Sequence, residues 1–330
     1  MTPQLKSCLL GFALLLGVLQ FASALLPRQP AQAASPIQNA KRAAFLKLID
    51  RPRVPLAAEV KELSETDGLV QTQFSFAAEA SQRVPGLLVK PVKAASTSNG
   101  RRPVIIALHG TGGNKESQLA LLQDLARLGF IGVAIDGRYH GARTKAGKGS
   151  EEYSEAMLRT YRTSKELPFL YDTVWDVLRL LDYLETRPDV DAQRIGMIGF
   201  SKGGMETYLA AAVDARIAVA VPCIGVQSFR WALEQNAWQS RVGTFQAAIN
   251  GAAKDENVTD INTAFVRKFY DRVMPGIHGE FDGPEMLPLI APRPLLVING
   301  DSDARTPLPG LMDCVEKARQ SYASAKAEEK

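Results

Sequence analysis

Arg194-Ile-Gly-Met-Ile-Gly-Phe-Ser201-Lys-Gly-Gly-Met205 is the stretch of this 330-residue chain that decides its fold. The apolar run before Ser201 predicts a short buried strand, and the residues after it predict a helix. Gly199 and Gly203 lie two residues to either side of the serine, where a sharp strand-to-helix turn leaves no room for side chains. A helix that begins at Lys202 directs free N–H groups and a positive dipole end towards Ser201. The stretch therefore predicts a nucleophile elbow.

Apolar runs with strand patterns recur along the chain. Residues 69–76 have a period-two pattern, and residues 84–91 are suited to pair with them as a hairpin. Three apolar runs, at 103–110, 130–136 and 217–222, are typical of strands buried on both faces. Helical patterns separate these runs, and such alternation requires a parallel sheet with right-handed crossovers. The predicted fold is α/β, with a mostly parallel, doubly wound sheet and an N-terminal antiparallel hairpin.

Two helices between the strands have clear apolar stripes. Asn114 can cap the first helix, and Gly129 stops it. The stripe residues are Leu121, Leu122, Leu125 and Leu128 in the first helix, and Leu170, Val174, Val177, Leu181 and Leu184 in the second. A further strand is expected at 294–299, followed by a helix at 308–322.

The first 33 residues differ in character from the rest of the chain. An apolar run, Cys8 to Leu26, follows a lysine, and Ala31-Gln32-Ala33 offers an A-x-A cleavage site. Ala22-Ser23-Ala24 is an alternative site, and an uncleaved anchor helix is the alternative to cleavage because the run is nearly long enough to span a bilayer. A secretory signal peptide is predicted at 1–33. The protein is therefore expected in the periplasm or outside the cell, without stable membrane association after cleavage.

The remaining chain divides into a lead-in and one large domain. Residues 34–66 are a polar lead-in, and residues 67–330 are the α/β domain, with an insertion at about 225–287 after the sixth predicted strand. The insertion is mostly helical, and it either covers the site as a lid or uses its aromatic residues for its own packing. These aromatic residues are Trp231, Trp238, Phe245, Phe265, Phe269 and Tyr270.

Composition narrows the possible partners. The chain is 46% hydrophobic and 22% charged, as expected of a globular protein, and its formal charge is +4. So small a charge, without a basic run, argues against nucleic acid as a partner. Cys223 and Cys314 can form a disulfide in an exported protein or remain as two buried thiols, and their spacing does not decide between these. Oligomeric state does not follow from the sequence.

The chain resembles the α/β-hydrolase superfamily over roughly residues 69–323. It is most similar to the dienelactone-hydrolase-like and acetyl-esterase-like branch, which shades into the prolyl-oligopeptidase-type peptidases. Three motifs carry the resemblance: Arg187-Pro-Asp-Val-Asp-Ala-Gln-Arg-Ile-Gly-Met-Ile-Gly-Phe-Ser201-Lys-Gly-Gly204, His109-Gly-Thr-Gly-Gly113 and Gly300-Asp-Ser-Asp-Ala-Arg-Thr-Pro307.

The resemblance implies a role for each motif. Ser201 would be the nucleophile, and a histidine held by a carboxylate would activate it. The N–H of Lys202 and that of Thr111 or Gly112 would form the oxyanion hole. The acid would be Asp303, because the family places it three residues after the glycine, whereas Asp301 reads as a solvated turn residue. His109 would be structural, and neither a metal nor an organic cofactor is implied.

The expected base is the point at which the sequence departs from the pattern. The family order is Ser, Asp, His, but residues 304–330 contain no histidine, and the chain has only His109, His140 and His278. Three explanations remain: the chain is truncated before the last strand, histidine and helix; His278 or His140 substitutes; or the protein binds without hydrolysis. Truncation is the favoured expectation, and it would leave residues 294–299 as an exposed apolar edge.

The predicted function is hydrolysis of carboxylic esters of small molecules through an acyl-enzyme on Ser201, inactive if no base is present. A catalytically silent binding protein on the same fold is the alternative, and a dipeptidyl- or oligopeptidase-like serine peptidase is a third. The basic loop with Arg138 and Arg143 either favours an acidic substrate or is solvated. The acyl and alcohol parts of the substrate do not follow from the sequence.

Overall fold

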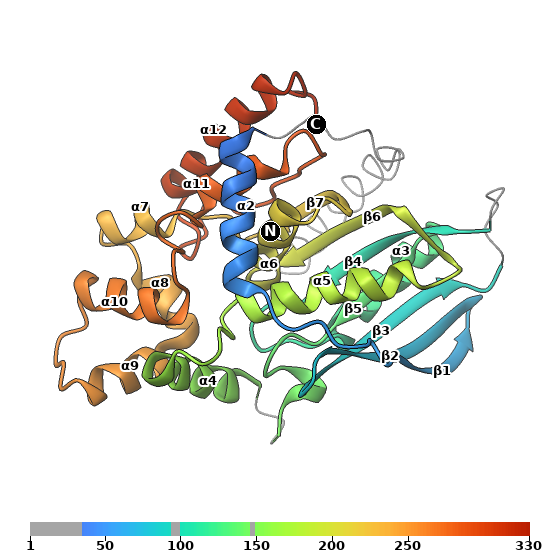
Figure 1. Cartoon of the computed structure of the whole chain (residues 1–330), viewed down its shortest axis with the longest axis horizontal. Helices are drawn as coiled ribbons and strands as arrows, with labels where there is room; N and C mark the ends of the chain where they lie inside the picture. Colours follow the sequence, from blue (N-terminus) through green and yellow to red (C-terminus); the bar gives the residue numbers. More distant parts are fainter. Residues whose placement is uncertain (1–34, 94–99, 146–148) are drawn as a thin grey trace, which may run out of the picture.

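The structure is a computed structural model that describes residues 35–93, 100–145 and 149–330 (Figure 1). The predicted signal peptide, with both cleavage sites, lies outside the described residues. A seven-stranded sheet has the order β1-β2-β3-β5-β4-β6-β7. The strands are β1 (Glu59–Thr66), β2 (Leu69–Glu79), β3 (Gln82–Pro91), β4 (Arg102–Leu108), β5 (Ile131–Ile135), β6 (Val190–Phe200) and β7 (Ile217–Cys223).

The sheet is mixed, which corrects the prediction of a mostly parallel one. The predicted hairpin is confirmed as β2 and β3, which pair antiparallel from Leu69↔Pro91 to Glu79↔Gln82. β1 also pairs antiparallel with β2, and β3 with β5, whereas β5, β4, β6 and β7 are parallel neighbours. β1 falls in the predicted lead-in and was not expected, because every one of its residues is exposed and none supplies a burial signal.

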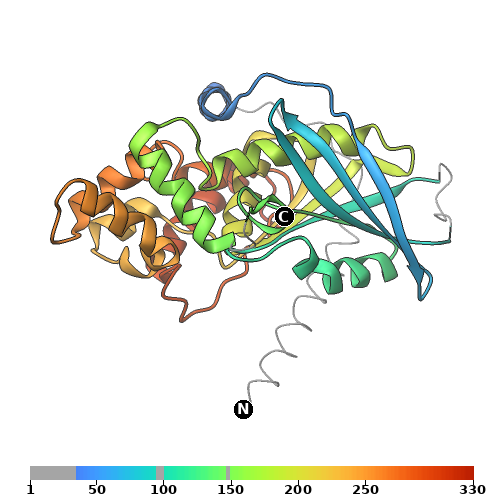
Figure 2. The same ribbon diagram turned by 90° about the horizontal axis from the view of Figure 1, so that it is seen from below.

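Helices cover both faces of the sheet. In Figure 2, α3 (Leu119–Arg127) lies below the sheet, and α2 (Pro36–Ile49) and α5 (Tyr171–Glu185) lie above it. The prediction that Asn114 caps this helix is wrong, because α3 begins at Leu119 with Gln118 at its N-cap and no side-chain cap bond. Asn114 Oδ1 instead accepts from Ser117 N–H at 2.8 Å, at the short 3-10 turn Glu116–Gln118 that precedes α3. α6 (Lys202–Val213) packs against α5 and α2, and α12 (Leu308–Ser324) lies at the place predicted for the last helix.

The predicted insertion forms a helical group beside the carboxyl ends of the strands (Figure 1). It comprises α7 (Phe229–Glu234), α8 (Gln239–Val242), α9 (Gln246–Asp255), α10 (Thr263–Val273) and α11 (Gly283–Met286), and it packs against α4 (Gly149–Thr163). Phe245 stacks on Phe269 at a ring distance of 5.8 Å, and Phe269 stacks on Tyr161 of α4 at 5.4 Å. These aromatic residues therefore form the packing of the insertion.

Residues 294–299 lie beside β7 but do not form a regular strand. Two isolated parallel bridges, Ala220↔Leu295 and Cys223↔Ile298, join them to β7. All six residues from 294 to 299 are partly exposed. On the side that faces β7, Leu296 and Ile298 donate their N–H groups to β7 carbonyls. The predicted strand is therefore correct in place and direction and wrong in regularity, because only two isolated bridges join it to β7.

The two cysteines of the described chain are free thiols, and both are buried. Burial raises the pKa of the Cys223 thiol to about 12 and that of Cys314 well above its usual value. Of the two readings of the sequence, the structure therefore has buried thiols and no disulfide.

Candidate active site

Ser201 sits in the strained turn that its flanking glycines predict. Its φ of 53° and ψ of −110° are unfavourable for a residue with a side chain, and such strain is typical of functional turns. The Ser201 N–H donates to Cys223 O on β7 at 2.9 Å, and its carbonyl accepts from Met205 N–H at 3.1 Å. The turn is thereby tied to both the neighbouring strand and α6. Ser201 keeps partial exposure although Lys202 and Gly203 beside it are buried.

The two glycines of the elbow have no room for a side chain. A Cβ on Gly199 would lie 2.1 Å from Gly203 O, and one on Gly203 would lie 2.5 Å from Leu108 O at the end of β4. Both obstacles are backbone atoms, which a rotamer change cannot move. The steric explanation given for these glycines is therefore supported by the packing of the described chain.

The predicted oxyanion loop lies against the elbow. Gly113 N–H donates to Gly110 O at 3.1 Å, which closes a tight turn, and Gly112 has the positive φ of 80° that such a turn requires. A Cβ on Gly110 would lie 3.6 Å from the Ser201 Cβ. The structure thus brings Gly110, which directly precedes Thr111 and Gly112, to the side of Ser201, and the oxyanion role of Thr111 or Gly112 stays a prediction. The N–H of Lys202 belongs to the first turn of α6, where amides have no acceptor within the helix.

Asp303 follows the 294–299 segment and is held by its own loop. Its Oδ1 accepts from Arg305 N–H at 2.9 Å, and its Oδ2 accepts from the buried Thr306 hydroxyl at 2.8 Å. Asp301 is exposed and accepts from Ser302 Oγ at 2.9 Å. Asp303 is therefore held by more hydrogen bonds than Asp301, but no described histidine bonds it, and its role as the acid stays a prediction.

His109 uses both ring nitrogens in structural hydrogen bonds. Nδ1–H donates to Gly110 O at 2.8 Å, and Nε2 accepts from Gly137 N–H at 3.0 Å. Burial, with the Lys202 charge nearby, lowers the pKa of His109 to about 3. A neutral ring with no free nitrogen cannot take a proton from Ser201, so His109 links the oxyanion loop to the loop after β5.

His140 is fully buried beneath this region. Its Nδ1 donates to Arg138 O at 2.7 Å, and its Nε2 has no hydrogen-bond partner among the described residues. Its ring centre lies 5.1 Å from that of His109, and burial lowers its pKa to about 2. His140 is thus a poor candidate for the base, because it resists protonation.

His278 lies in the insertion and is paired there. Its Nε2 bonds Asp271 Oδ1 at 2.7 Å, and its Nδ1 lies 3.4 Å from an Arg267 nitrogen. No hydrogen bond joins His278 to Ser201 or Asp303 within the described chain. None of the three histidines is therefore brought to Ser201 by a hydrogen bond, and the expectation of a truncated chain stays a prediction.

The two buried histidines predict a loss of stability in mild acid. In the unfolded chain each takes up a proton below about pH 6.5, whereas in the fold they stay neutral until about pH 3 and pH 2. Because the unfolded state then binds more protons, the free energy of unfolding should fall by about 1.4 kcal/mol per pH unit for each histidine below pH 6.5. Urea unfolding at pH 7.0, 6.0 and 5.0 measures this. A constant free energy across that range would contradict it.

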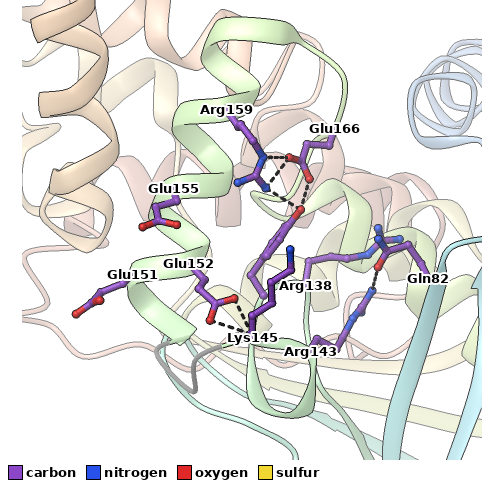
Figure 3. Close-up of a pocket in the computed structure, with 10 residues that line it drawn as sticks. Gln82, Arg138, Arg143, Lys145, Glu151, Glu152, Glu155, Arg159 and Glu166 are labelled. Atoms are coloured by element: carbon purple, nitrogen blue, oxygen red, sulfur yellow. Dashed lines mark hydrogen bonds and ion pairs between the residues drawn. The ribbon is translucent and has the colours of Figure 1, made fainter.

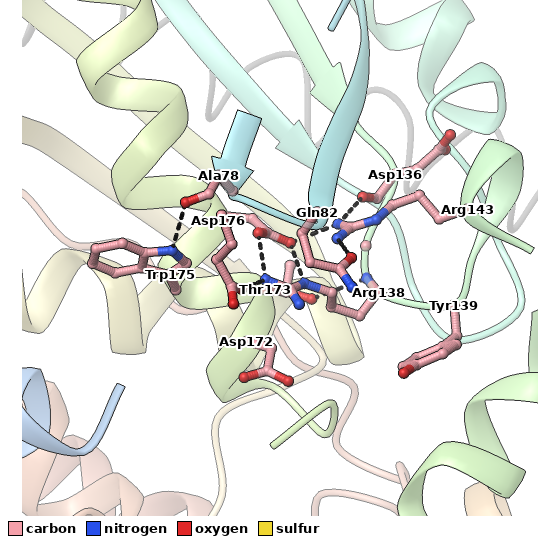
Figure 4. A network of polar contacts seen from close by, with 12 residues as sticks. Ala78, Gln82, Asp136, Arg138, Tyr139, Arg143, Asp172, Thr173, Trp175 and Asp176 are labelled. Carbon is pink, nitrogen blue, oxygen red and sulfur yellow. Dashed lines mark hydrogen bonds and ion pairs between the residues drawn. The ribbon is translucent and has the colours of Figure 1, made fainter. Parts of the chain in front are cut away.

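The basic loop after β5 is directed into the protein (Figure 4). Arg138 Nε lies 2.8 Å from Asp176 Oδ2, and Arg143 Nη1 lies 2.6 Å from the same oxygen. Arg138 also pairs with Glu79. These two arginines are therefore paired with carboxylates rather than simply solvated, and they also line an open cavity beside α4, so an acidic substrate stays a prediction.

A second buried ion pair, which the sequence reasoning missed, lies directly behind the elbow. Lys202 Nζ donates to Glu206 Oε1 at 2.7 Å, and both side chains are almost fully buried. Their i,i+4 spacing on the predicted helix was the available signal. Glu206 Oε2 and the Tyr153 hydroxyl, like His140 Nε2, are buried without a hydrogen-bond partner in the described part of the chain.

An open cavity of about 830 Å³ lies beside α4 (Figure 3). Its lining is almost entirely charged or polar: Gln82, Arg138, Tyr139, Arg143, Lys145, Glu151, Glu152, Glu155, Arg159 and Glu166. Ser201 and Asp303 are not among these residues. The start of α4 nevertheless adjoins the oxyanion loop, because a Cβ on Gly112 would lie 2.7 Å from Ser150 Oγ.

The described residues also bear on two other kinds of site. They contain no group of three or more His, Cys, Asp or Glu side chains arranged to hold a metal ion. None of the helices in this part of the chain is both long and apolar enough to cross a membrane.

A known family and a known protein match the part of the chain that carries these motifs. The family profile described as "Glucuronyl esterase, fungi" matches residues 85–325, a range that includes the oxyanion loop, Ser201 and Asp303. The protein YtaP of Bacillus subtilis (strain 168), which is named only as a hydrolase, is 28% identical over 287 residues, covering 83% of each chain.

Solved structures share the fold at low sequence identity. Acetyl xylan esterase 1 from Thermoanaerobacterium sp. JW/SL YS485 has a TM-score of 0.57 and 17% identity, over 87% of this chain and 85% of that one. A glucuronoyl esterase from Solibacter usitatus has a TM-score of 0.56 and 18% identity, over 89% and 82%. The α/β fold with its mixed sheet is therefore that of esterases of this kind.

Proposed function

Because this chain belongs to the glucuronyl esterase family of α/β-hydrolase esterases, we propose that it hydrolyses esters formed between the carboxyl group of a uronic acid and an alcohol. One observation carries the proposal: the family match extends from residue 85 to residue 325 and so includes every motif assigned to the site. The names of the similar structures, which are esterases acting on carbohydrate esters, support a sugar substrate over a peptide.

In the proposed reaction, Ser201 Oγ attacks the ester carbonyl and the alcohol leaves, which gives an acyl-enzyme that water then hydrolyses. The N–H of Lys202, with that of Thr111 or Gly112, stabilises the negative oxygen of each tetrahedral intermediate. Asp303 orients the base in this proposal. The base itself is unassigned, because His109 and His140 are buried and bonded elsewhere.

Binding without turnover is the second candidate function. The observation that favours it is that no histidine of the described chain bonds Ser201 or Asp303, although a serine needs a base to become a good nucleophile. Export through the predicted signal peptide is compatible with both candidates, and we propose that the protein acts outside the cytoplasm.

Benzyl D-glucuronate distinguishes the two candidates. The esterase proposal expects release of benzyl alcohol, followed by chromatography, at a rate that is proportional to protein concentration and well above the buffer rate. Benzyl β-D-glucoside, which has no ester, is the control and should remain intact. Saturable binding of the ester by calorimetry without alcohol release would overturn the esterase proposal in favour of the binding function.

A further inference from the structure

One buried arginine in the insertion lacks the partner that every comparable side chain has. Five basic side chains, each at most 6% exposed, are buried in the described parts of the chain. Four of them have a carboxylate within hydrogen-bond distance: Lys115 with Asp136 (2.8 Å), Arg138 with Asp176 (2.8 Å), Arg179 with Asp182 (2.5 Å) and Lys202 with Glu206 (2.7 Å). Arg241, which is 3% exposed, has none.

Arg241 is held by two neutral acceptors. Its Nε donates to Gln227 Oε1 at 3.1 Å, and its Nη2 donates to Arg305 O at 3.0 Å. Nη1 has no hydrogen-bond partner among the described residues, although it is not one of the fully enclosed unpaired atoms. The guanidinium is thus fixed in place with one donor edge left unused.

These contacts tie Arg241 to two segments that adjoin the acid loop and the elbow helix. Arg305, whose carbonyl it bonds, donates its own N–H to Asp303 Oδ1. Gln227, whose amide oxygen it bonds, belongs to the segment after β7, and its amide nitrogen lies 3.7 Å from Met205 Sδ on the elbow helix. Arg241 therefore bridges the acid loop and the segment that adjoins the elbow.

Asp303 forms no ion pair with Arg241, although its charge lies near enough to favour the charged guanidinium. Both of its oxygens accept hydrogen bonds within its own loop, from Arg305 N–H and the Thr306 hydroxyl. No ion pair within 4.0 Å joins it to Arg241 in the described chain. A buried cation without an ion-pair partner is poorly compensated for its lost hydration, and burial accordingly lowers the Arg241 pKa to about 10 even though the Asp303 charge opposes that shift.

We propose that Arg241 anchors a subsite for a carboxylate group of the ligand, beside the acid loop. A planar guanidinium with free N–H donors fits a carboxylate better than any neutral group, and a site already dehydrated strengthens that bond. The ligand class is a sugar acid, and its sugar part rests on the proposed function. The carboxylate belongs either to the acid product or to a neighbouring acidic residue of a longer substrate.

Calorimetry with D-glucuronate and its neutral isostere D-glucuronamide tests the subsite without any turnover. The wild-type chain should bind glucuronate at least tenfold more tightly than the amide, and Arg241→Gln should remove that difference. Arg305→Gln is the matched control: it removes an exposed charge nearby but keeps the carbonyl that Arg241 bonds, so the preference should persist. Equal affinities in the wild type, no binding of glucuronate, or a preference retained in Arg241→Gln would overturn the proposal.

Two further measurements distinguish loss of the subsite from a folding defect. Near-ultraviolet circular dichroism shows whether Arg241→Gln is folded. If it is not, the proposal is tested by the glucuronate-to-glucuronamide affinity ratio of the wild type and of Arg241→Lys. Arg241→Lys keeps the charge but loses the planar fork, so it should retain only part of the preference. Ester hydrolysis without a preference for glucuronate would overturn the subsite alone, whereas the preference without hydrolysis would overturn only the proposed esterase activity.

Discussion

Replacing Ser201 with alanine should abolish the ester hydrolysis catalysed by this protein. The change removes the only atom that can form the acyl-enzyme, while the oxyanion donors, which are backbone N–H groups, remain. Where the base of such a serine is in place, its loss lowers kcat by a factor on the order of 10⁶. Release of 4-nitrophenol from 4-nitrophenyl acetate, measured for both proteins under identical conditions, gives the ratio.

Ser302→Ala is the matched control for this experiment. It removes a hydroxyl of the same kind from the exposed acid loop, where Ser302 bonds only Asp301, so the rate should be unchanged. Hydrolysis by Ser201→Ala at the wild-type rate would show that the reaction does not pass through the elbow.

His278→Asn tests in the same assay whether His278 acts as the base. We expect a rate within twofold of wild type, because that ring is held by Asp271 on the insertion.

Of the substitutions proposed outside the site, Asp176→Asn should lower the free energy of unfolding most. Asp176 is fully buried and binds both Arg138 and Arg143, and these two cations hold its pKa below the usual value although burial alone would raise it. The asparagine keeps the volume but leaves two buried guanidinium groups without their shared charge. Loss of one partner from a buried pair typically costs about 3–5 kcal/mol.

Urea unfolding at pH 7 measures this change in the free energy of unfolding. Asp255→Asn is the control, because Asp255 forms a similar two-oxygen pair with Arg162 at the surface, where water replaces the lost partner at little cost. If Asp176→Asn and Asp255→Asn lost equally little stability, the buried network of Figure 4 would not be a main support of the loop after β5.

The parts of the structure that were predicted from sequence depend on local signals. The elbow needs small residues at Gly199 and Gly203, the hairpin needs period-two alternation, and α5 needs an apolar stripe. Each requirement can be read within about fifteen residues. α4 was overlooked although Tyr153, Met157 and Tyr161, all buried, recur at helical spacing, so in that case a usable signal was missed.

The parts that were not predicted depend on contacts between distant segments. Arg138 and Asp176 are 38 residues apart, and nothing in the loop indicated that its arginines turn inward. Arg241 and Arg305 are 64 residues apart, so the unpaired charge beside the acid loop emerges only from the folded chain. β1 has no buried residue at all, and its pairing with β2 depends on backbone hydrogen bonds that leave little trace in the sequence.

The glycine contacts of the elbow also constrain when the site can form during folding. Gly203 packs on Leu108 of β4, and Ser201 bonds Cys223 of β7, so the turn is shaped by segments about 95 residues upstream and 22 residues downstream of it. Contacts of such long sequence separation form slowly, because chain entropy is lost before they can stabilise anything. The strained serine geometry is consequently a late product of folding. During refolding, recovery of Ser201 reactivity would therefore mark the point at which the central sheet has assembled.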